Sequence, residues 1–207
     1  FDSSWATLGE LKKQVAGTED SSSLIDDLSD TLKVLANELR NIVPEESRGR
    51  DRKRKCSIPE SVRTVIAMSS AQAKKCGVKL LIEGSDEEWV ISMRRSAFIQ
   101  VLGNLLDNGI YWAAHREDAR VVVKLIPSAQ TIIVVDTGPG IESHHRENIF
   151  DQNFTVKEEG YGLGLWLARD LTERVLGGRL IDLAEDLYEE FSLPAEGAAF
   201  KLTFNSQ

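Results

Sequence analysis

The sequence predicts a two-layer α/β sandwich preceded by a helical dimerisation segment. Three observations support this fold class. Near the N-terminus, apolar residues recur at alternating spacings of four and three, as in a helix that packs against another helix. From residue 57 onward, amphipathic stretches alternate with short runs rich in Val, Ile and Leu. Brief turns join some of these runs as in antiparallel hairpins, so we expect helices on one face of a sheet.

Length and composition fit an ordinary globular protein. The 207 residues are 42% hydrophobic and 28% charged, and 33 acidic against 25 basic side chains give a net charge of −8. This balance argues against nucleic acid as a partner, because such binding neutralises phosphates with Lys and Arg. No apolar run approaches the ~18 residues that cross a bilayer, so we expect no membrane contact by this fragment.

The cysteines and the first residue bear on location and extent. The two cysteines, Cys56 and Cys76, form neither a disulfide framework nor a metal quartet, so we expect free thiols in a reducing, cytoplasmic environment. Because the chain begins at Phe1 rather than Met, we expect a fragment whose parent could be membrane-anchored.

Residues 1–45 are expected to form a partial helical hairpin used for dimerisation. A heptad seam runs from residue 23 to 43 and ends at Pro44. One seam of this length cannot bury itself. Its partner is therefore either the Trp5–Val15 helix or a second copy of the chain. The apolar positions of the seam are Leu28, Leu32, Leu35, Leu39 and Ile42.

Residues 46–56 form a basic stretch between the two parts of the chain. We expect a solvated linker, because like charges repel one another and keep the chain extended. A nucleic-acid patch is the less favoured alternative, since no aromatic side chain interleaves the basic ones.

Residues 57–207 are expected to form one domain. The capping box Ser57-Ile-Pro-Glu60 opens a helix that ends near Gly77. Pro127-Ser128 joins two β-rich runs as a hairpin. The expected strands are residues 78–83, 88–93, 121–126, 131–135, 180–183 and 198–204, and two further helices span residues 94–115 and 163–176.

The helix over residues 94–115 carries a line of carboxamides beside its buried stripe. Gln100, Asn104 and Asn108 follow one another at intervals of four residues, so they share one helix face. Their oxygens could bind a hard cation. The alternative is that these amides satisfy backbone groups where helices pack, and both interpretations stay open at this point.

A second pattern directly follows the strand that ends at Val135. In Asp136-Thr137-Gly138-Pro139-Gly140-Ile141, a carboxylate at the end of a strand precedes two glycines. This places a hydrogen-bond acceptor beside backbone that another group can approach closely. A plain Gly-Pro-Gly turn is the alternative.

A third pattern leads into the helix over residues 163–176. In Gly160-Tyr161-Gly162-Leu163-Gly164, glycines at alternate positions free the backbone amides to point together. The helix N-terminus adds positive potential for a phosphate. The motif is weak evidence alone, and it is not a Walker loop, because no Gly-Lys-Ser/Thr follows.

Together and in this order, the three patterns resemble the N, G1 and G2 boxes of the GHKL ATP-binding superfamily, which implies a Bergerat-type ATP-binding fold. Within it, the chain is similar to the short-lid catalytic domain of a sensor histidine kinase. Residues 149–157 lie where such kinases carry their F box, with only five residues between Phe154 and Gly160. The resemblance covers about residues 57–204 and suggests that the heptad helix belongs to a dimerising bundle.

The resemblance implies ATP and Mg²⁺ as cofactors. Asp136 would accept a hydrogen bond from the exocyclic amine of adenine, and Asn104 and Asn108 would hold Mg²⁺. Lys157 would bring a mobile positive charge to the terminal phosphate, and Tyr111 would reach a phosphate or stack beside the ligand. The remaining positions implied around the nucleotide are Gly138, Gly140, Ile141, Phe154, Thr155, Gly160, Tyr161, Gly162, Leu163 and Gly164.

Asn104 distinguishes between branches of the superfamily. The hydrolytic branches carry Glu there as a general base for water, whereas an amide cannot take a proton at neutral pH. Asn104 therefore favours a phosphoryl donor, with Asp107 as the alternative base. Gly109 replaces the usual Ala after the N box, and Tyr161 stands where Thr is common.

The acceptor histidine of a kinase is missing from this chain. Its three histidines, His115, His144 and His145, fall inside the ATP-binding region, the last two on a short helix after Ile141, and we interpret all three as exposed imidazoles without a function. We expect a two-component transferase fragment that passes the ATP γ-phosphoryl group to a histidine outside this chain. Its expected partners are a response regulator and, through the N-terminal helices, a second copy. A GHKL ATPase acting as a nucleotide-driven clamp and a degenerate ATP-binding interaction module remain alternatives.

Overall fold

The computed structural model describes residues 52–84, 86–114, 116–157, 160–183 and 197–205. The chain divides into two units, and all the described residues belong to the second, Asp51–Gln207. The predicted heptad helix and its possible partner helix lie outside the described residues. Dimerisation through the N-terminal helices therefore stays a prediction.

The domain is built on a five-stranded sheet with the strand order β2-β4-β5-β7-β6. β2 runs parallel to β4, and the other neighbouring strands are antiparallel. The predicted hairpin of β4 and β5 is present, with Val123 opposite Val134. The strands are Lys79–Glu83 (β2), Arg120–Ile126 (β4), Thr131–Asp136 (β5), Gly178–Asp182 (β6) and Ala199–Phe204 (β7).

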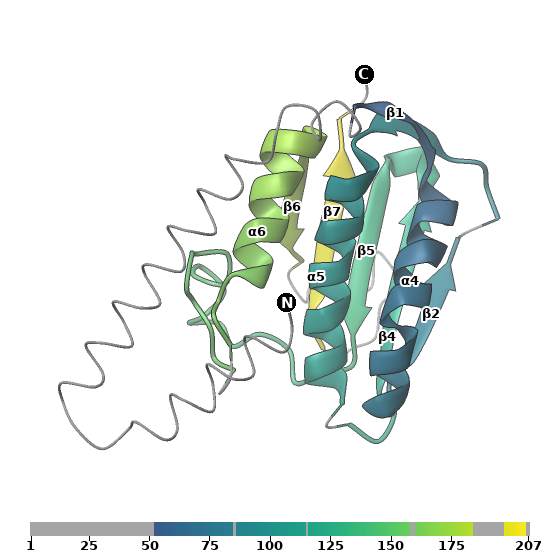
Figure 1. The fold of residues 1–207 in the computed structure, drawn as a ribbon. Coiled ribbons are helices and arrows are strands. Elements are labelled where there is room, and N and C mark those ends of the chain that lie inside the picture. Colours follow the sequence, from purple (N-terminus) through teal and green to yellow (C-terminus); the bar gives the residue numbers. More distant parts are fainter. Residues whose placement is uncertain (1–51, 85, 115, 158–159, 184–196, 206–207) are drawn as a thin grey trace, which may run out of the picture. The chain divides into compact units, whose positions relative to one another are not determined.

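Three helices cover one face of this sheet (Figure 1): α4 (Ile58–Lys75), α5 (Arg95–Ala113) and α6 (Gly164–Leu171). A π-helical turn over Thr172–Leu176 continues α6 to Gly177, which ends it with a φ of 70°. The predicted two-layer α/β sandwich is confirmed. Within the described ranges, every helix is too short or too polar to serve as a membrane span.

The core lies between the helices and the sheet, and α5 runs through its centre. Phe98, Leu102 and Ile110 are completely buried along α5, and each such side chain contributes about 1.5–3 kcal/mol of burial free energy. Trp112, which the sequence places in the same stripe, is only half-buried. The C-terminal half of α5 therefore stays in the core through Ile110 and Ala113 on one face, while its other face, with Asn108 and Tyr111, is partly open to a ligand.

The basic linker was predicted to extend to residue 56, and this is wrong for its last residues. Arg54–Ser57 form strand β1, which pairs antiparallel with β3 (Val90–Met93) and places Cys56 opposite Ile91. Cys56 is buried, so this end of the basic stretch packs against the domain although its charges favour a solvated linker. Ser57 caps α4 as predicted, since its hydroxyl accepts from Glu60 N at 3.4 Å.

The strands expected over residues 78–83 and 88–93 are present as β2 and β3, and they belong to different sheets, since β2 joins β4 and β3 joins β1. One further local prediction needs correction. The short helix predicted after Ile141 is a series of turns over residues 143–150. The backbone bonds there have mixed spacing, since both Asn148 N and Ile149 N donate to His145 O, at 2.9 and 3.1 Å.

Candidate nucleotide-binding site

Asp136, the last residue of β5, is a buried carboxylate held by two backbone amides. Its Oδ1 accepts from Gly138 N at 2.8 Å and from Ala198 N at 3.3 Å. Burial raises the pKa of Asp136 from 3.8 to about 6, and the two hydrogen bonds and nearby Lys157 oppose this rise. Among the described residues both donors end on Oδ1, so Oδ2 is the oxygen that a ligand can use.

Two glycines bring α5 close to the strand end that carries Asp136. A Cβ on Gly109 would lie 3.0 and 3.2 Å from the two methyl groups of Val121. A Cβ on Gly138 would lie 2.7 Å from Asp136 Oδ1 and 2.9 Å from Trp112 Cβ. Gly109, where the resemblance leads us to expect Ala, therefore fits the close approach of this helix to the sheet.

The three carboxamides of α5 differ in their exposure. Gln100 is exposed, whereas Asn104 and Asn108 are half-buried. Asn104 Nδ2 is buried and has no acceptor among the described residues, and such an unpaired donor costs about 1–3 kcal/mol. An amide offers its oxygen to a cation and its N–H to a phosphate oxygen. The residues present therefore fit a magnesium nucleotide.

Lys157, the last residue of the F box, lies beside two aromatic rings of α5. Its Nζ lies 4.3 Å from the centroid of the Tyr111 ring and 6.0 Å from that of Trp112. Burial lowers the pKa of Lys157 from 10.5 to about 8, and the charges of Asp107 and Asp136 oppose this shift. Asp107, weighed above as a base, is exposed and acts electrostatically on this lysine.

The glycine turn before α6 packs on the F box. Gly162 has a φ of +64°, and its carbonyl accepts from Asn153 N at 3.1 Å. A Cβ there would collide with the backbone of Asn153 and Phe154, and one on Gly160 would collide with Thr155. A Cβ on Gly164 would meet nothing within 4 Å. The first two glycines are therefore required by packing, and Gly164 is not.

The F-box aromatics anchor this segment to the domain. Phe150 is buried, with its ring centroid 6.1 Å from that of Phe200 and 5.0 Å from the Arg169 guanidinium. Phe154 is half-buried and meets the His145 ring edge to face at 5.4 Å.

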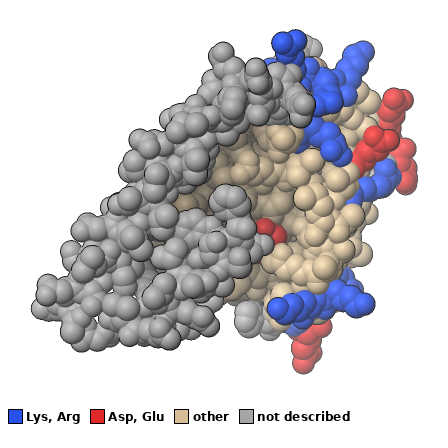
Figure 2. Space-filling view, viewed as in Figure 1, with Lys and Arg blue, Asp and Glu red and all other residues tan. Residues whose placement is uncertain are grey.

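On the face shown in Figure 2, most charged side chains of the described part lie at its edges, and an acidic side chain is visible in a recess.

The structure brings most of the sequence-predicted residues to one end of the sheet. Asp136, Gly138, Lys157 and Tyr111 are linked by the contacts above, and Gly160 and Gly162 join them through residues 153–157. Of the other predicted positions, Tyr161 is exposed, Leu163 is half-buried, and Ile141 packs on the main core.

Sequence reasoning missed two contributors to the site. Ala198 N binds the carboxylate of Asp136, and Gly197, with a φ of +113°, lets the chain pass close to Asp136 O. Gly140, with a φ of +81°, lies against Gly197. The glycine just before the last strand was the available signal. Trp112, which is half-buried, lies against Gly138.

Comparisons with known proteins agree with this geometry. The family described as histidine kinase-, DNA gyrase B-, and HSP90-like ATPase matches residues 93–207, more than half of the chain. The match begins at the end of β3 and includes all three glycine- and amide-bearing motifs.

Curated relatives are sensor proteins. The swarming motility regulation sensor protein RssA of Serratia marcescens is 33% identical over 114 residues, which cover 53% of this chain and 24% of that protein. The sensor protein FixL of Bradyrhizobium diazoefficiens is 31% identical over 137 residues, which cover 65% of this chain and 27% of that protein. The chain thus spans about a quarter of the length of these relatives.

Solved structures share the fold. The catalytic domain of histidine kinase ThkA matches with a TM-score of 0.59 and 23% identity, over 73% of this chain and 93% of that one. Full-length ShkA in complex with AMPPNP matches with a TM-score of 0.59 and 20% identity, over 99% of this chain and 47% of that one. At these identities the likeness concerns the fold.

Proposed function

Because the chain belongs to the family of histidine kinase-, DNA gyrase B- and HSP90-like ATPases, we propose that it is the ATP-binding catalytic part of a two-component sensor histidine kinase. The observation that carries the proposal is the environment of Asp136. Its carboxylate is buried at the end of β5, oriented by two backbone amides, and near Lys157. In this arrangement, Asp136 Oδ2 can accept a hydrogen bond from a nucleotide base, and the Lys157 ammonium can bind the phosphates of the same nucleotide.

The roles of the side chains follow from where they lie. Asp136 Oδ2 accepts from the adenine amine, and the amides of Gly162 and Gly164 bind phosphate oxygens at the start of α6. Lys157 leaves the ring of Tyr111 and moves to the terminal phosphate. Asn104 and Asn108 would hold Mg²⁺, which neutralises charge on the transferred phosphoryl group.

The reaction is transfer rather than hydrolysis. The N-box position holds Asn104, whose amide cannot accept a proton from water. Catalysis then depends on positioning the γ-phosphoryl group in line with its acceptor. We propose that the acceptor is a histidine outside this chain and that a response regulator takes the phosphoryl group afterwards. The relatives' names, which are those of sensor proteins and a sensor protein kinase, support this partner.

Assembly and location are part of the same proposal. The heptad seam of residues 23–43 supports a homodimer through the N-terminal helices. Cys56 and Cys76 are both free thiols, which supports a reducing cytoplasm.

Labelled ATP tests the proposed reaction. The chain is incubated with γ-labelled ATP, Mg²⁺ and the histidine-bearing helices of its parent protein. Acid-labile, alkali-stable label on those helices is expected. Released phosphate without protein label would instead indicate a nucleotide-driven clamp, and neither product would indicate an interaction module. In the same assay, Asp136→Asn should lose transfer while Asp86→Asn, at an exposed position after β2, should keep it.

A further inference from the structure

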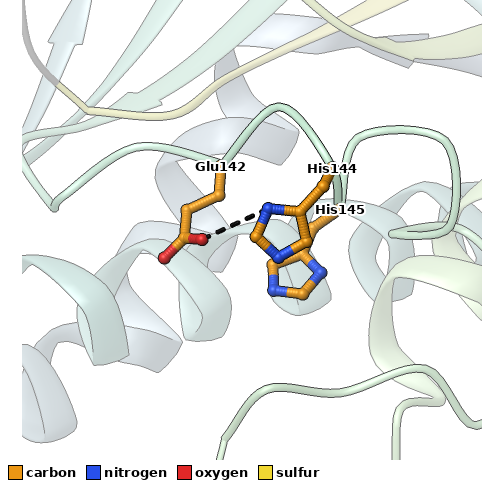
Figure 3. A group of neighbouring side chains, drawn as sticks. All are labelled: Glu142, His144 and His145. Carbon is orange, nitrogen blue, oxygen red and sulfur yellow. Dashed lines mark ion pairs between the residues drawn. The ribbon is translucent and has the colours of Figure 1, made fainter.

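A group of metal-ligating side chains lies outside the nucleotide site, in the turns that follow Ile141. Glu142, His144 and His145 each offer one ligand atom, and these atoms lie within 4.8 Å of one another. We propose that the three side chains bind one divalent transition-metal ion, with Zn²⁺ or Ni²⁺ as the probe. Figure 3 shows the Glu142 carboxylate and the two imidazoles gathered on one side of the turn.

The donor set selects this class of ion. Two imidazole nitrogens and one carboxylate oxygen suit Zn²⁺ and Ni²⁺, whereas Mg²⁺ prefers oxygen ligands and keeps its waters. The proposed ion is therefore distinct from the Mg²⁺ of the nucleotide site. Ligand atoms around a tetrahedral zinc ion lie about 3.3 Å apart, so side-chain rotations suffice to close the present separations.

The backbone holds the three ligands in one turn. His145 N donates to Glu142 O at 2.9 Å. His144 Nδ1 lies 3.4 Å from Glu142 Oε2, and the rings of His144 and His145 have centroids 3.8 Å apart, with their planes tilted by 49°. The ligands thus already face one another, which reduces the entropy lost when an ion orders them.

Residues that follow the three ligands hold the turn against the domain. Arg146 Nη1 lies 2.5 Å from Asp182 Oδ2 at the end of β6. Ile149 and Phe150 are buried in the core. The exposed ends of Glu142 and His144 remain open to solvent, which leaves a coordination position for water.

The proposed metal site contacts the F box. The His145 ring contacts the Phe154 ring at 5.4 Å between centroids. An ion that fixes His145 would therefore restrain the F-box aromatic on which the glycine turn packs. The two histidines, interpreted from the sequence as non-functional, thus acquire a role that does not depend on the proposed kinase activity.

Metal titration of the nucleotide-free chain tests the site. All proteins carry Cys76→Ser, because an exposed thiol competes for Zn²⁺. Calorimetry with Zn²⁺, and separately with Ni²⁺, should show one ion per chain, and a large excess of Mg²⁺ should not displace it. Binding that shows no such stoichiometry, or that Mg²⁺ abolishes, would overturn the proposal.

Variants identify the ligands. His144→Ala and Glu142→Gln, both at exposed positions, should each weaken binding by about tenfold or more, and the double variant His144→Ala/His145→Ala should abolish it. His115→Ala is the matched control, because it removes the chain's remaining histidine. Circular dichroism and thermal melting establish that each variant is folded. If the folded His144→Ala protein binds with unchanged affinity, the assigned ligands are wrong.

Discussion

Replacing Asp136 by Asn should weaken nucleotide binding while stabilising the fold. The side chain is 2% exposed, and burial raises its pKa from 3.8 to about 6. The folded protein therefore holds this proton more tightly than the unfolded chain does. The stability that the group contributes is full below pH 3.8 and is lost as the pH rises to about 6. Above that pH, the loss amounts to about 3 kcal/mol.

The Asn variant removes this penalty. Its side-chain oxygen still accepts from Gly138 N and Ala198 N, which now bind Asp136 Oδ1. At pH 7.5 we expect the free energy of unfolding to rise by about 1–3 kcal/mol and its dependence on pH between 4 and 6 to flatten. In the proposed complex, however, its new N–H₂ group would face the adenine amine, so that one donor would meet another. Losing a hydrogen bond to a charged acceptor costs about 1.5–3 kcal/mol, or roughly tenfold or more in affinity.

Urea unfolding at several pH values and calorimetry with ADP measure the two effects. Asp86→Asn, at an exposed position, should change neither quantity. A folded Asp136→Asn protein with unchanged affinity would remove Asp136 from the nucleotide site. A large loss of stability would show that the carboxylate is structural and that any loss of affinity follows from misfolding.

Three other substitutions test the rest of the site. Lys157→Met should weaken ADP binding but not adenosine binding, measured by calorimetry. The pKa of Lys157 is lowered to about 8, and a bound phosphate would raise it. Binding of ADP at pH 8.5 should therefore be accompanied by proton uptake in the wild type but not in Lys157→Met, as calorimetry in buffers of different ionisation enthalpy would show. Gly162→Ala should unfold at a lower temperature in thermal melts, whereas Gly164→Ala, with open space at its Cβ, should not. Asn104→Ala should bind magnesium ADP more weakly without losing stability in urea, since its buried N–H₂ has no acceptor among the described residues. Equal melting temperatures for the two glycine variants, or a destabilised Asn104→Ala, would contradict these assignments.

Features that depend on neighbours along the chain could be predicted from the sequence. The stripe of α5 fixes which face is buried, so the placement of Asn104 and Asn108 on another face followed from helical spacing. Asp136 stands at the end of a β-rich run, and its position at a strand terminus followed directly.

Features that depend on distant partners could not be predicted in this way. Nothing near residues 54–57 indicates that they pair with Val90–Met93, because strand pairing is decided by residues far along the chain. The position of Lys157 over Tyr111 depends on how the F box, residues 149–157, packs against α5. The amide of Ala198 reaches Asp136 only because β5 and β7 are neighbours in the sheet.

That amide gives the last strand an importance beyond its place in the core. Ala198 donates to a carboxylate 62 positions earlier in the chain, and Asp136 N donates back to Ala198 O at 3.0 Å. During synthesis, the carboxylate proposed to bind adenine therefore gains its second backbone donor only after the ribosome has passed residue 198. A product that ends earlier would contain all three boxes and yet hold Asp136 by the Gly138 amide alone, so the boxes by themselves do not establish a complete site.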